Sequence, residues 1–302
     1  MPKKTICESV RDGKILVSDG ACGTFLQQAG LKTGECPEMW NLTHRDVIAR
    51  MAQEYIDAGS DMVQTNSFGG SRFKLEAFDL SEKTREINEA AAAIAREAVG
   101  DDHWVIASVG PTGKMLLMGD VTEQELYDAF AEQAMSLARG GADGICVETM
   151  SAVDEAVQAI KAAKENTACE VISTFTYEAT VQGDYRTMMG VSPREGAQAA
   201  VEAGADIVGT NCGNGIAGMV DIVKEIREVC PDIPILVHAN AGLPKQVGEE
   251  MVFPEKPDEM AAQVPDLITA GADVVGGCCG TTPEHIRAMK NAVKRNRVSV
   301  SE

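Results

Sequence analysis

The sequence predicts a parallel, eight-stranded (β/α)8 barrel of the TIM type, formed by residues 1–302 as a single domain. Three observations lead to this fold class. A short glycine–aspartate motif recurs four times, apolar strand-like segments alternate with helical segments, and polar side chains follow the strands at one end. Eight strand–helix units in about 300 residues match the usual size of a (β/α)8 barrel.

The repeated motif lies at 58–61, 140–143, 203–206 and 270–273, each time after a helical segment. A glycine just past the end of a helix supplies the left-handed turn that stops it. The aspartate that follows then begins the link into a short apolar run. The spacing between copies leaves room for two strand–helix units rather than one.

Strands and helices alternate along the whole chain. The strands are expected at 14–17, 62–63, 104–107, 144–147, 171–175, 207–208, 234–237 and 274–275. The helices are expected at 46–58, 82–99, 122–140, 152–165, 193–203, 216–229 and 257–270. Continuous apolar strands with helical crossovers predict a parallel sheet covered on both faces. A doubly wound open sheet is the alternative, but its Gly-x-Gly-x-x-Gly turn does not follow the first strand.

The composition argues against several classes of function. A net charge of −19 and an isoelectric point near 4.6 disfavour binding to nucleic acid and to anionic membranes. The first residues lack the apolar core of a secretory signal, and no run approaches the roughly 18 apolar residues of a membrane span. We therefore expect a cytoplasmic protein. In a reducing compartment, its nine cysteines indicate metal-binding, catalytic or buried thiols rather than disulfides.

Polar or metal-binding residues follow almost every predicted strand. In chain order they are Asp19, Asn66, Gly110, Glu148, Thr176, Cys212, Asn240 and the pair Cys278 and Cys279. The carboxyl ends of the strands are where (β/α)8 enzymes place their active sites. A purely structural barrel has little reason for polar residues there.

Cys212, Cys278 and Cys279 have the pattern of a catalytic zinc site. Three protein ligands leave the fourth zinc position for water or substrate, whereas structural sites use four. A single cysteine is more often a small buried residue. Adjacent residues on a strand point to opposite faces, however, so the pair at 278–279 needs the bend that its flanking glycines allow.

Three thiolate ligands favour alkyl transfer to sulfur. They give bound zinc a net charge of about −1, and a substrate thiol in the fourth position then loses its proton at neutral pH. Hydrolytic zinc sites normally use histidine and carboxylate ligands instead. The nearest histidine in the sequence, His238, is expected to pack in the barrel wall.

Asp19 and Glu148 are the acids at strand ends, and a buried carboxylate needs a partner. We interpret them as a site for a substrate ammonium, with a helix cap as the alternative for Asp19. Asn66 and Asn240 are candidates for hydrogen bonds to the substrate or for the open metal position. Loop amides are the alternative partners of both asparagines.

Seven segments resemble the homocysteine S-methyltransferase family: 19–24, 65–69, 109–113, 147–149, 211–212, 240–242 and 276–283. The resemblance extends from about residue 10 to about residue 292. It is closest to the N-terminal homocysteine-binding module of cobalamin-dependent methionine synthase. It implies a (β/α)8 barrel with zinc bound by Cys212, Cys278 and Cys279, and with Asn240 in the fourth position when homocysteine is absent.

The resemblance also implies how the acceptor binds. The amino-acid end of homocysteine would be held by Asp19, Glu148 and the amides of Gly20 and Ala21. Gly280 is typical of the cobalamin-type branch, because enzymes that use S-methylmethionine often have arginine there. Cys22 departs from the family, which usually has methionine or tyrosine at this position.

We therefore expect a zinc-dependent methyltransferase. It would move a methyl group from methylcobalamin, carried as a methyl-corrinoid by a separate partner protein, to the thiol of homocysteine and form methionine. The alternatives are a small sulfonium or betaine donor, another thiol acceptor, and a zinc-binding accessory subunit that docks a corrinoid protein without turnover. The presence of Asp19 and Glu148 beside the three cysteines argues against an accessory subunit.

Overall fold

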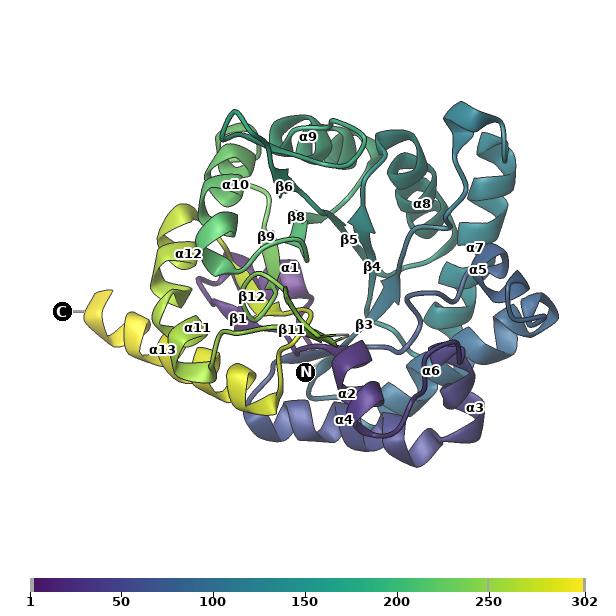
Figure 1. The fold of residues 1–302 in the computed structure, drawn as a ribbon, viewed down its shortest axis with the longest axis horizontal. Coiled ribbons are helices and arrows are strands. Elements are labelled where there is room, and N and C mark those ends of the chain that lie inside the picture. Colours follow the sequence, from purple (N-terminus) through teal and green to yellow (C-terminus); the bar gives the residue numbers. More distant parts are fainter. Residues whose placement is uncertain (1–2, 249, 301–302) are drawn as a thin grey trace.

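A computed structural model describes residues 3–248 and 250–300 of the chain. Eight parallel strands form one sheet in the order β1-β12-β9-β8-β5-β4-β3-β2, and helices surround them (Figure 1). The strands are β1 Leu16–Val17, β2 Met62–Gln64, β3 Trp104–Val109, β4 Gly144–Met150, β5 Glu170–Phe175, β8 Ile207–Asn211, β9 Ile235–Ala239 and β12 Val274–Gly277. The predicted (β/α)8 barrel is confirmed, although most strands run further at their carboxyl ends than expected.

Six of the seven predicted helices match the structure to within two residues. They are α4 Arg45–Ala58, α6 Thr84–Val99, α7 Glu123–Arg139, α8 Val153–Asn166, α9 Pro193–Ala203 and α10 Ile216–Val229. The single helix predicted at 257–270 is wrong. Two helices, α11 Pro257–Ala262 and α12 Val264–Ala270, occupy this range because Pro265 has no N–H to continue the first one.

Further elements lie before the first strand, in the connections between strands and helices, and after the last strand. The helices are α1 Ile6–Arg11, α2 Cys22–Gln28, α3 Trp40–Thr43, α5 Arg72–Glu76 and α13 Pro283–Val300. Two short hairpins, β6 Glu178–Ala179 with β7 Tyr185–Arg186 and β10 Lys245–Val247 with β11 Glu250–Val252, extend from the β5–α9 and β9–α11 loops. Among the described residues, no helix combines the length and the hydrophobicity that a membrane span requires.

The four repeated aspartates join neighbouring strands at their amino ends. The carboxylates of Asp61, Asp143, Asp206 and Asp273 each accept a backbone N–H from the preceding strand, at 2.7, 2.8, 2.8 and 2.9 Å. Each carboxylate also pairs with a basic side chain on a helix, respectively Lys290, Arg96, Lys164 and Arg227. The glycine of each motif has a positive φ, as the sequence predicted.

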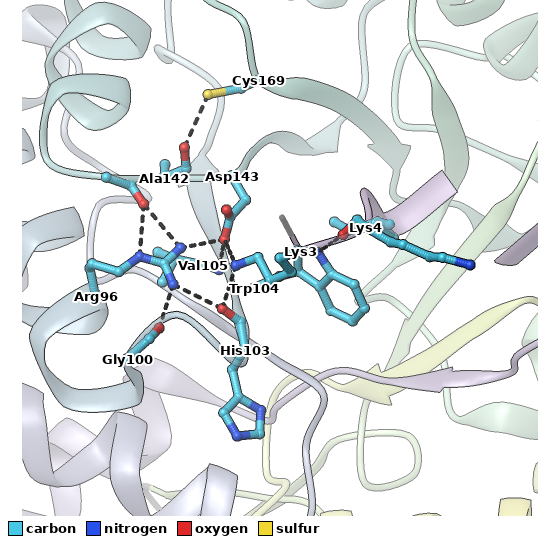
Figure 2. Close-up of polar contacts among 12 residues, drawn as sticks. Lys3, Lys4, Arg96, Gly100, His103, Trp104, Val105, Ala142, Asp143 and Cys169 are labelled. Atoms are coloured by element: carbon cyan, nitrogen blue, oxygen red, sulfur yellow. Dashed lines mark hydrogen bonds and ion pairs between the residues drawn. The ribbon is translucent and has the colours of Figure 1, made fainter. Parts of the chain in front are cut away.

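We call each of these aspartates, with its backbone donor and its basic partner, an aspartate clamp. Figure 2 shows the clamp of Asp143, in which the guanidinium of Arg96 makes most of the contacts. This guanidinium donates to the carbonyl oxygens of Gly141 (3.1 and 3.2 Å), Gly100 (2.6 Å) and His103 (2.9 Å), and it pairs with Asp143. A guanidinium provides five donors in a rigid plane, so one side chain can fix several carbonyls together with a carboxylate.

Side-chain carboxylates also join the two strands at the ends of the sheet order, β1 and β2. At the amino end, the N–H of Asp61 donates to the Val17 carbonyl at 2.7 Å, and the N–H of Val17 donates to the Asp61 carboxylate. Towards the carboxyl end, the N–H of Gln64 donates to Asp19 Oδ2 at 2.6 Å. Asp19 therefore takes the place of a backbone carbonyl where the barrel closes.

The interior of the barrel is apolar at the amino ends of the strands and polar one layer further along. The apolar layer consists of Leu16, Met62, Ile106, Cys146, Ile172, Ile207, Leu236 and Val274, and α1 covers it with Ile6 and Cys7. Glu170 holds α1 in place by accepting the N–H groups of both α1 residues, at 2.6 and 2.9 Å. Two positions further along six strands are Ser18, Gln64, Ser108, Glu148, Thr174 and His238, which face the same interior because side chains alternate along a strand.

We expect the aspartate clamps to contribute measurably to stability. Asp61→Ala leaves the Val17 N–H without its acceptor and the largely buried Lys290 ammonium without its partner. The free energy of unfolding in urea should fall by about 1–3 kcal/mol. Asp221→Ala, which removes an exposed pair with Lys224 on one helix, should scarcely change it. An equal loss in both variants would contradict a special role for the clamps.

Candidate active site

A cavity of about 290 Å³ opens at the carboxyl ends of the strands. Its walls are formed by residues 20–24 and 64–68, together with Glu148 and the three cysteines predicted to bind metal. The strand ends therefore bring together residues that are far apart in the sequence, as the barrel prediction required. Glu148 itself lies within β4, at an irregularity in the pairing between Val147 and Met150, rather than beyond the strand.

The thiols of Cys212, Cys278 and Cys279 converge at one point of this cavity. The Sγ atoms of Cys212 and Cys278 each lie 4.0 Å from that of Cys279, and all three lie within 4.8 Å of one another. Tetrahedral zinc with bonds of about 2.3 Å holds its sulfur ligands about 3.8 Å apart. Two of the three sulfur–sulfur distances are therefore close to those of a tetrahedral zinc site, and the third is no longer than 4.8 Å.

The electrostatics of the three thiols favour a bound cation. Hydrogen bonds from the Cys278 and Cys279 thiols hold the pKa of Cys212 far below its ordinary value. Conversely, the Cys212 thiolate raises the pKa of Cys278, and raises that of Cys279 to about 11. Without a counter-charge only one of the three ionises readily. A divalent cation supplies the positive charge that lets all three act as thiolate ligands.

Strained backbone positions Cys212. Its φ is +59°, in a region that few residues other than glycine adopt. Its N–H donates to the His238 carbonyl at 3.0 Å, and its carbonyl accepts the N–H of Asn214 at 2.8 Å. Such strain is common at functional sites, where the surroundings fix one conformation.

Cys278 and Cys279 lie in a turn that is fixed from both sides. The Cys278 N–H donates to the Ala239 carbonyl at 2.7 Å, and the Cys279 carbonyl accepts the Ala241 N–H at 3.0 Å. Gly280 follows with a φ of +79°, which supplies the bend predicted for the paired thiols. A Cβ at Gly280 would lie 2.2 Å from the Cβ of Phe253, so this ring occupies the space that a side chain would need.

Asn240 lies beside the thiols, as expected. It is buried, and a hydrogen bond from it helps to lower the pKa of Cys212. Its Oδ1 has no hydrogen-bond partner among the described residues. An unpartnered amide oxygen on a residue that contacts Cys212 fits a fourth metal ligand, although a role of Asn240 in binding stays a prediction.

Glu148 presents a buried carboxylate to the cavity. Ser108 Oγ and Gln64 Nε2, the latter at 3.1 Å, both donate to its Oε1. Burial raises the pKa of Glu148 above its ordinary value because the charged form loses hydration. A cationic group of a ligand is the partner that such a carboxylate lacks.

Asp19 lies next to the cavity but does not line it. Its two oxygens accept hydrogen bonds from the Gln64 N–H and from Ser18 Oγ, and burial raises its pKa to about 7. The helix-cap alternative is wrong, because the N-cap residue of α2 is Ala21 and no side chain caps the helix there. The role predicted for Asp19 towards a substrate ammonium stays a prediction.

Gly20 and Ala21 form a wall of the cavity. The Ala21 N–H, however, donates to Thr281 Oγ1 at 3.0 Å. Gly20 has no space for a side chain, since a Cβ there would lie 2.7 Å from the same oxygen. Their role towards a substrate carboxylate stays a prediction.

Asn66 lines the cavity but uses its side chain to hold neighbouring segments. Its Nδ2 donates to the Pro37 carbonyl at 2.7 Å and to Asn41 Oδ1 at 3.1 Å. Its Oδ1 accepts from Cys22 Sγ at 3.5 Å. Burial, together with nearby carboxylates, raises the pKa of Cys22, so this unusual cysteine is a neutral thiol in the cavity wall.

Two site residues escaped prediction. Glu38 lines the cavity and accepts the Gly69 N–H at 2.6 Å, although its sequence context resembles an exposed helix start. Asn211, which directly precedes Cys212, is the second. Its Oδ1 accepts from the Thr149 N–H at 2.8 Å and its Nδ2 donates to Thr149 Oγ1 at 2.7 Å, which ties β8 to the residue after Glu148.

The fold and the site together define a (β/α)8 barrel in which three thiols converge beside a cavity lined by carboxylates. The sequence profile of the family described as homocysteine S-methyltransferase matches residues 16–293. The chain belongs to this family.

Individual relatives agree with the family assignment. Methionine synthases of Mycobacterium leprae and Mycobacterium tuberculosis are 34% and 32% identical over 93% of this chain, which spans about a quarter of their length (24% and 25%). The crystal structure of the homocysteine methyltransferase MmuM from Escherichia coli, in its metallated form, has a TM-score of 0.76 at 20% identity. That comparison covers 94% of this chain and 98% of MmuM, and it supports the fold.

We expect the purified protein to carry about one zinc ion per chain, with three thiolate ligands. Cys212→Ser, Cys278→Ser and Cys279→Ser should each lose most of the metal, while circular dichroism shows an intact barrel. Cys169→Ser, at a cysteine outside the cavity that contacts the Ala142 carbonyl, should retain it. Full zinc retention in any two of the three site variants would end the three-thiolate assignment.

Proposed function

We propose that this chain catalyses zinc-dependent transfer of a methyl group from a methyl-corrinoid protein to the thiol of homocysteine, which gives methionine. The observation that carries the proposal is the placement of three convergent thiols and the Glu148 carboxylate in one cavity. The family and the methionine synthase relatives support this reaction. Cys212, Cys278 and Cys279 would hold the zinc, with Asn240 as a fourth ligand before the substrate binds.

The chemistry of the site suits a thiol acceptor. Zinc bound by three thiolates lowers the pKa of a further thiol and leaves its sulfur nucleophilic. The acceptor would then react as a thiolate: a carbon–sulfur bond would form, the carbon–cobalt bond of the donor would break, and the electron pair of that bond would stay on cobalt. The cavity walls contribute by holding the sulfur in line with the methyl group.

Glu148 would recognise the ammonium group of the acceptor. Its carboxylate faces the cavity, and the Ser108 hydroxyl and the Gln64 amide fix its orientation. Asp19 would add negative charge behind the cavity wall and keep Gln64 in place through its N–H. The residues at the start of α2, Gly20 and Ala21, would lie near the carboxylate of the acceptor.

Exposed apolar side chains in the connections that follow the barrel strands support a donor carried by a protein. Eleven large apolar residues are exposed in the described part of the chain, and nine of them lie on loops that follow barrel strands. These nine, which we call the mouth collar, are Phe68, Met115, Leu117, Met118, Val181, Met188, Met189, Leu243 and Val252. Methionine-rich surfaces adapt well to protein partners.

Loss of the Glu148 charge should impair recognition of homocysteine specifically. A charge-assisted hydrogen bond contributes about 1.5–3 kcal/mol. Glu148→Gln should therefore raise the homocysteine concentration required for half-maximal rate by about tenfold to a hundredfold. The rate with mercaptoethanol, which has no ammonium, should barely change. If the unmodified enzyme uses both thiols equally well, these carboxylates do not select the acceptor.

The donor can be identified by direct comparison. A methylated corrinoid-binding module should serve much faster than free methylcobalamin, because docking replaces a diffusive encounter with a held geometry. S-methylmethionine and betaine should be poor donors. If either small donor outpaces methylcobalamin at equal concentration, the corrinoid assignment is wrong.

The mouth collar provides a matched test of docking. Met118→Glu and Met188→Glu should lower the rate with the protein-bound donor about tenfold or more, because a buried charge weakens an apolar contact. Their rates with free methylcobalamin should stay near that of the parent. Met135→Glu, an exposed methionine on the outer helix α7, is the control and should change neither rate.

A further inference from the structure

Two turns that border the cavity are joined directly to each other. The metal turn, residues 277–281, carries two of the cysteines, and the α2 turn, residues 19–24, leads into α2. Three hydrogen bonds link them: Gly277 N–H to the Asp19 carbonyl (2.8 Å), Ala21 N–H to Thr281 Oγ1 (3.0 Å) and Gly280 N–H to Thr24 Oγ1 (3.1 Å). The two turns are about 260 residues apart in the chain.

Thr281 is the side chain through which this link passes. It is buried, with 1% of its surface exposed. Its hydroxyl donates to the carbonyl of Cys278 at 2.7 Å and accepts the N–H of Ala21 at 3.0 Å. One hydroxyl therefore joins the backbone of a metal-turn cysteine to the backbone of the α2 turn.

The Thr281 hydroxyl occupies space that is free only because two neighbouring residues are glycines. A Cβ at Gly20 would lie 2.7 Å from its Oγ1, and a Cβ at Gly277 would lie 2.3 Å from the same atom. Tyr55 OH closes the arrangement by donating to the Ala21 carbonyl at 3.1 Å and to the Thr281 carbonyl at 3.5 Å. Glycines on both turns and a buried tyrosine thus hold the threonine in a single position.

We propose that Thr281 is a positioning residue that fixes the distance between the metal turn and the α2 turn. This inference rests on the proposed function, in which the acceptor sulfur lies at the cysteines and its amino-acid end lies towards Glu148 and the α2 turn. A ligand held at both ends is selected by its length. Since a misplacement of about 1 Å costs on the order of a hundredfold in rate, the link lets the site distinguish homocysteine from cysteine, which is one methylene shorter.

Thiol binding to the zinc-loaded protein tests the proposal. Isothermal titration should give the dissociation constants of homocysteine and cysteine for the parent, Thr281→Val and Thr281→Ser. Thr281→Val keeps the shape of the side chain but removes its hydrogen bonds, so homocysteine binding should weaken about tenfold and the preference over cysteine should narrow. Thr281→Ser keeps the hydroxyl, so its ratio of the dissociation constants of cysteine and homocysteine should equal that of the parent.

Thr84→Val is the matched control. Thr84 is equally buried (1%) and its hydroxyl also donates to a backbone carbonyl, that of Ser81 at 2.7 Å, but it lies outside the cavity. In Thr84→Val, the ratio of the dissociation constants of cysteine and homocysteine should equal that of the parent. The absorption spectrum of the cobalt(II)-substituted protein, with its thiolate charge-transfer bands, should show that Thr281→Val still holds the metal.

An unchanged preference for homocysteine in metal-loaded Thr281→Val would overturn the proposal. If this variant loses its metal, Tyr55→Phe decides, because it removes the hydroxyl that bonds the Ala21 and Thr281 carbonyls but leaves the hydrogen bond between Thr281 and Cys278 in place. A narrowed preference in Tyr55→Phe supports the proposal, and an unchanged one overturns it. A parent protein that binds neither thiol would instead disprove the proposed function.

Discussion

The active-site cavity depends on the register that four aspartates impose on the barrel. Each carboxylate joins the start of one strand to the loop before the next, with N–O distances of 2.7–2.9 Å. A parallel strand that slipped by one residue would turn its inner side chains outward, and these clamps oppose such a slip. Because the amino ends are fixed, the carboxyl ends reach a common level, and Cys212 meets Cys279 at 4.0 Å.

The cavity combines strong negative potential with a lack of internal compensation. The described residues that line it include Glu38, Glu148 and four cysteines, but no lysine, arginine or histidine. Burial raises the pKa of Glu148 and of the neighbouring Asp19 because neither carboxylate has a cationic partner. The site is therefore complementary to cations, namely a metal at the thiols and an ammonium near Glu148. The positive charges that balance the cavity would be supplied by the ligands rather than by the protein.

Repetition and residue type made much of this molecule predictable from sequence. The glycine–aspartate repeats located the barrel, and the cysteines identified the candidate metal site because thiols beyond strand ends have few other uses. The roles of Asn211 and Thr281 in linking separate segments could not be predicted, because their hydrogen-bond partners, Thr149 and the α2 turn, are distant in sequence. The helix predicted at 257–270 was wrong because its helical pattern continues past Pro265 although the backbone does not.

The closed amino end of the barrel has a kinetic consequence. Ile6 and Cys7 of α1 cover the apolar layer beneath the site, so the described cavity opens towards the loops at the opposite end. A macromolecular donor that covered the mouth collar would block this route. With the proposed donor, the small acceptor would have to enter first, and the methylated product would have to wait until the spent donor departs. A barrel closed at one end would thus impose a compulsory order of addition and release, with the departure of the large partner as a step that can limit turnover.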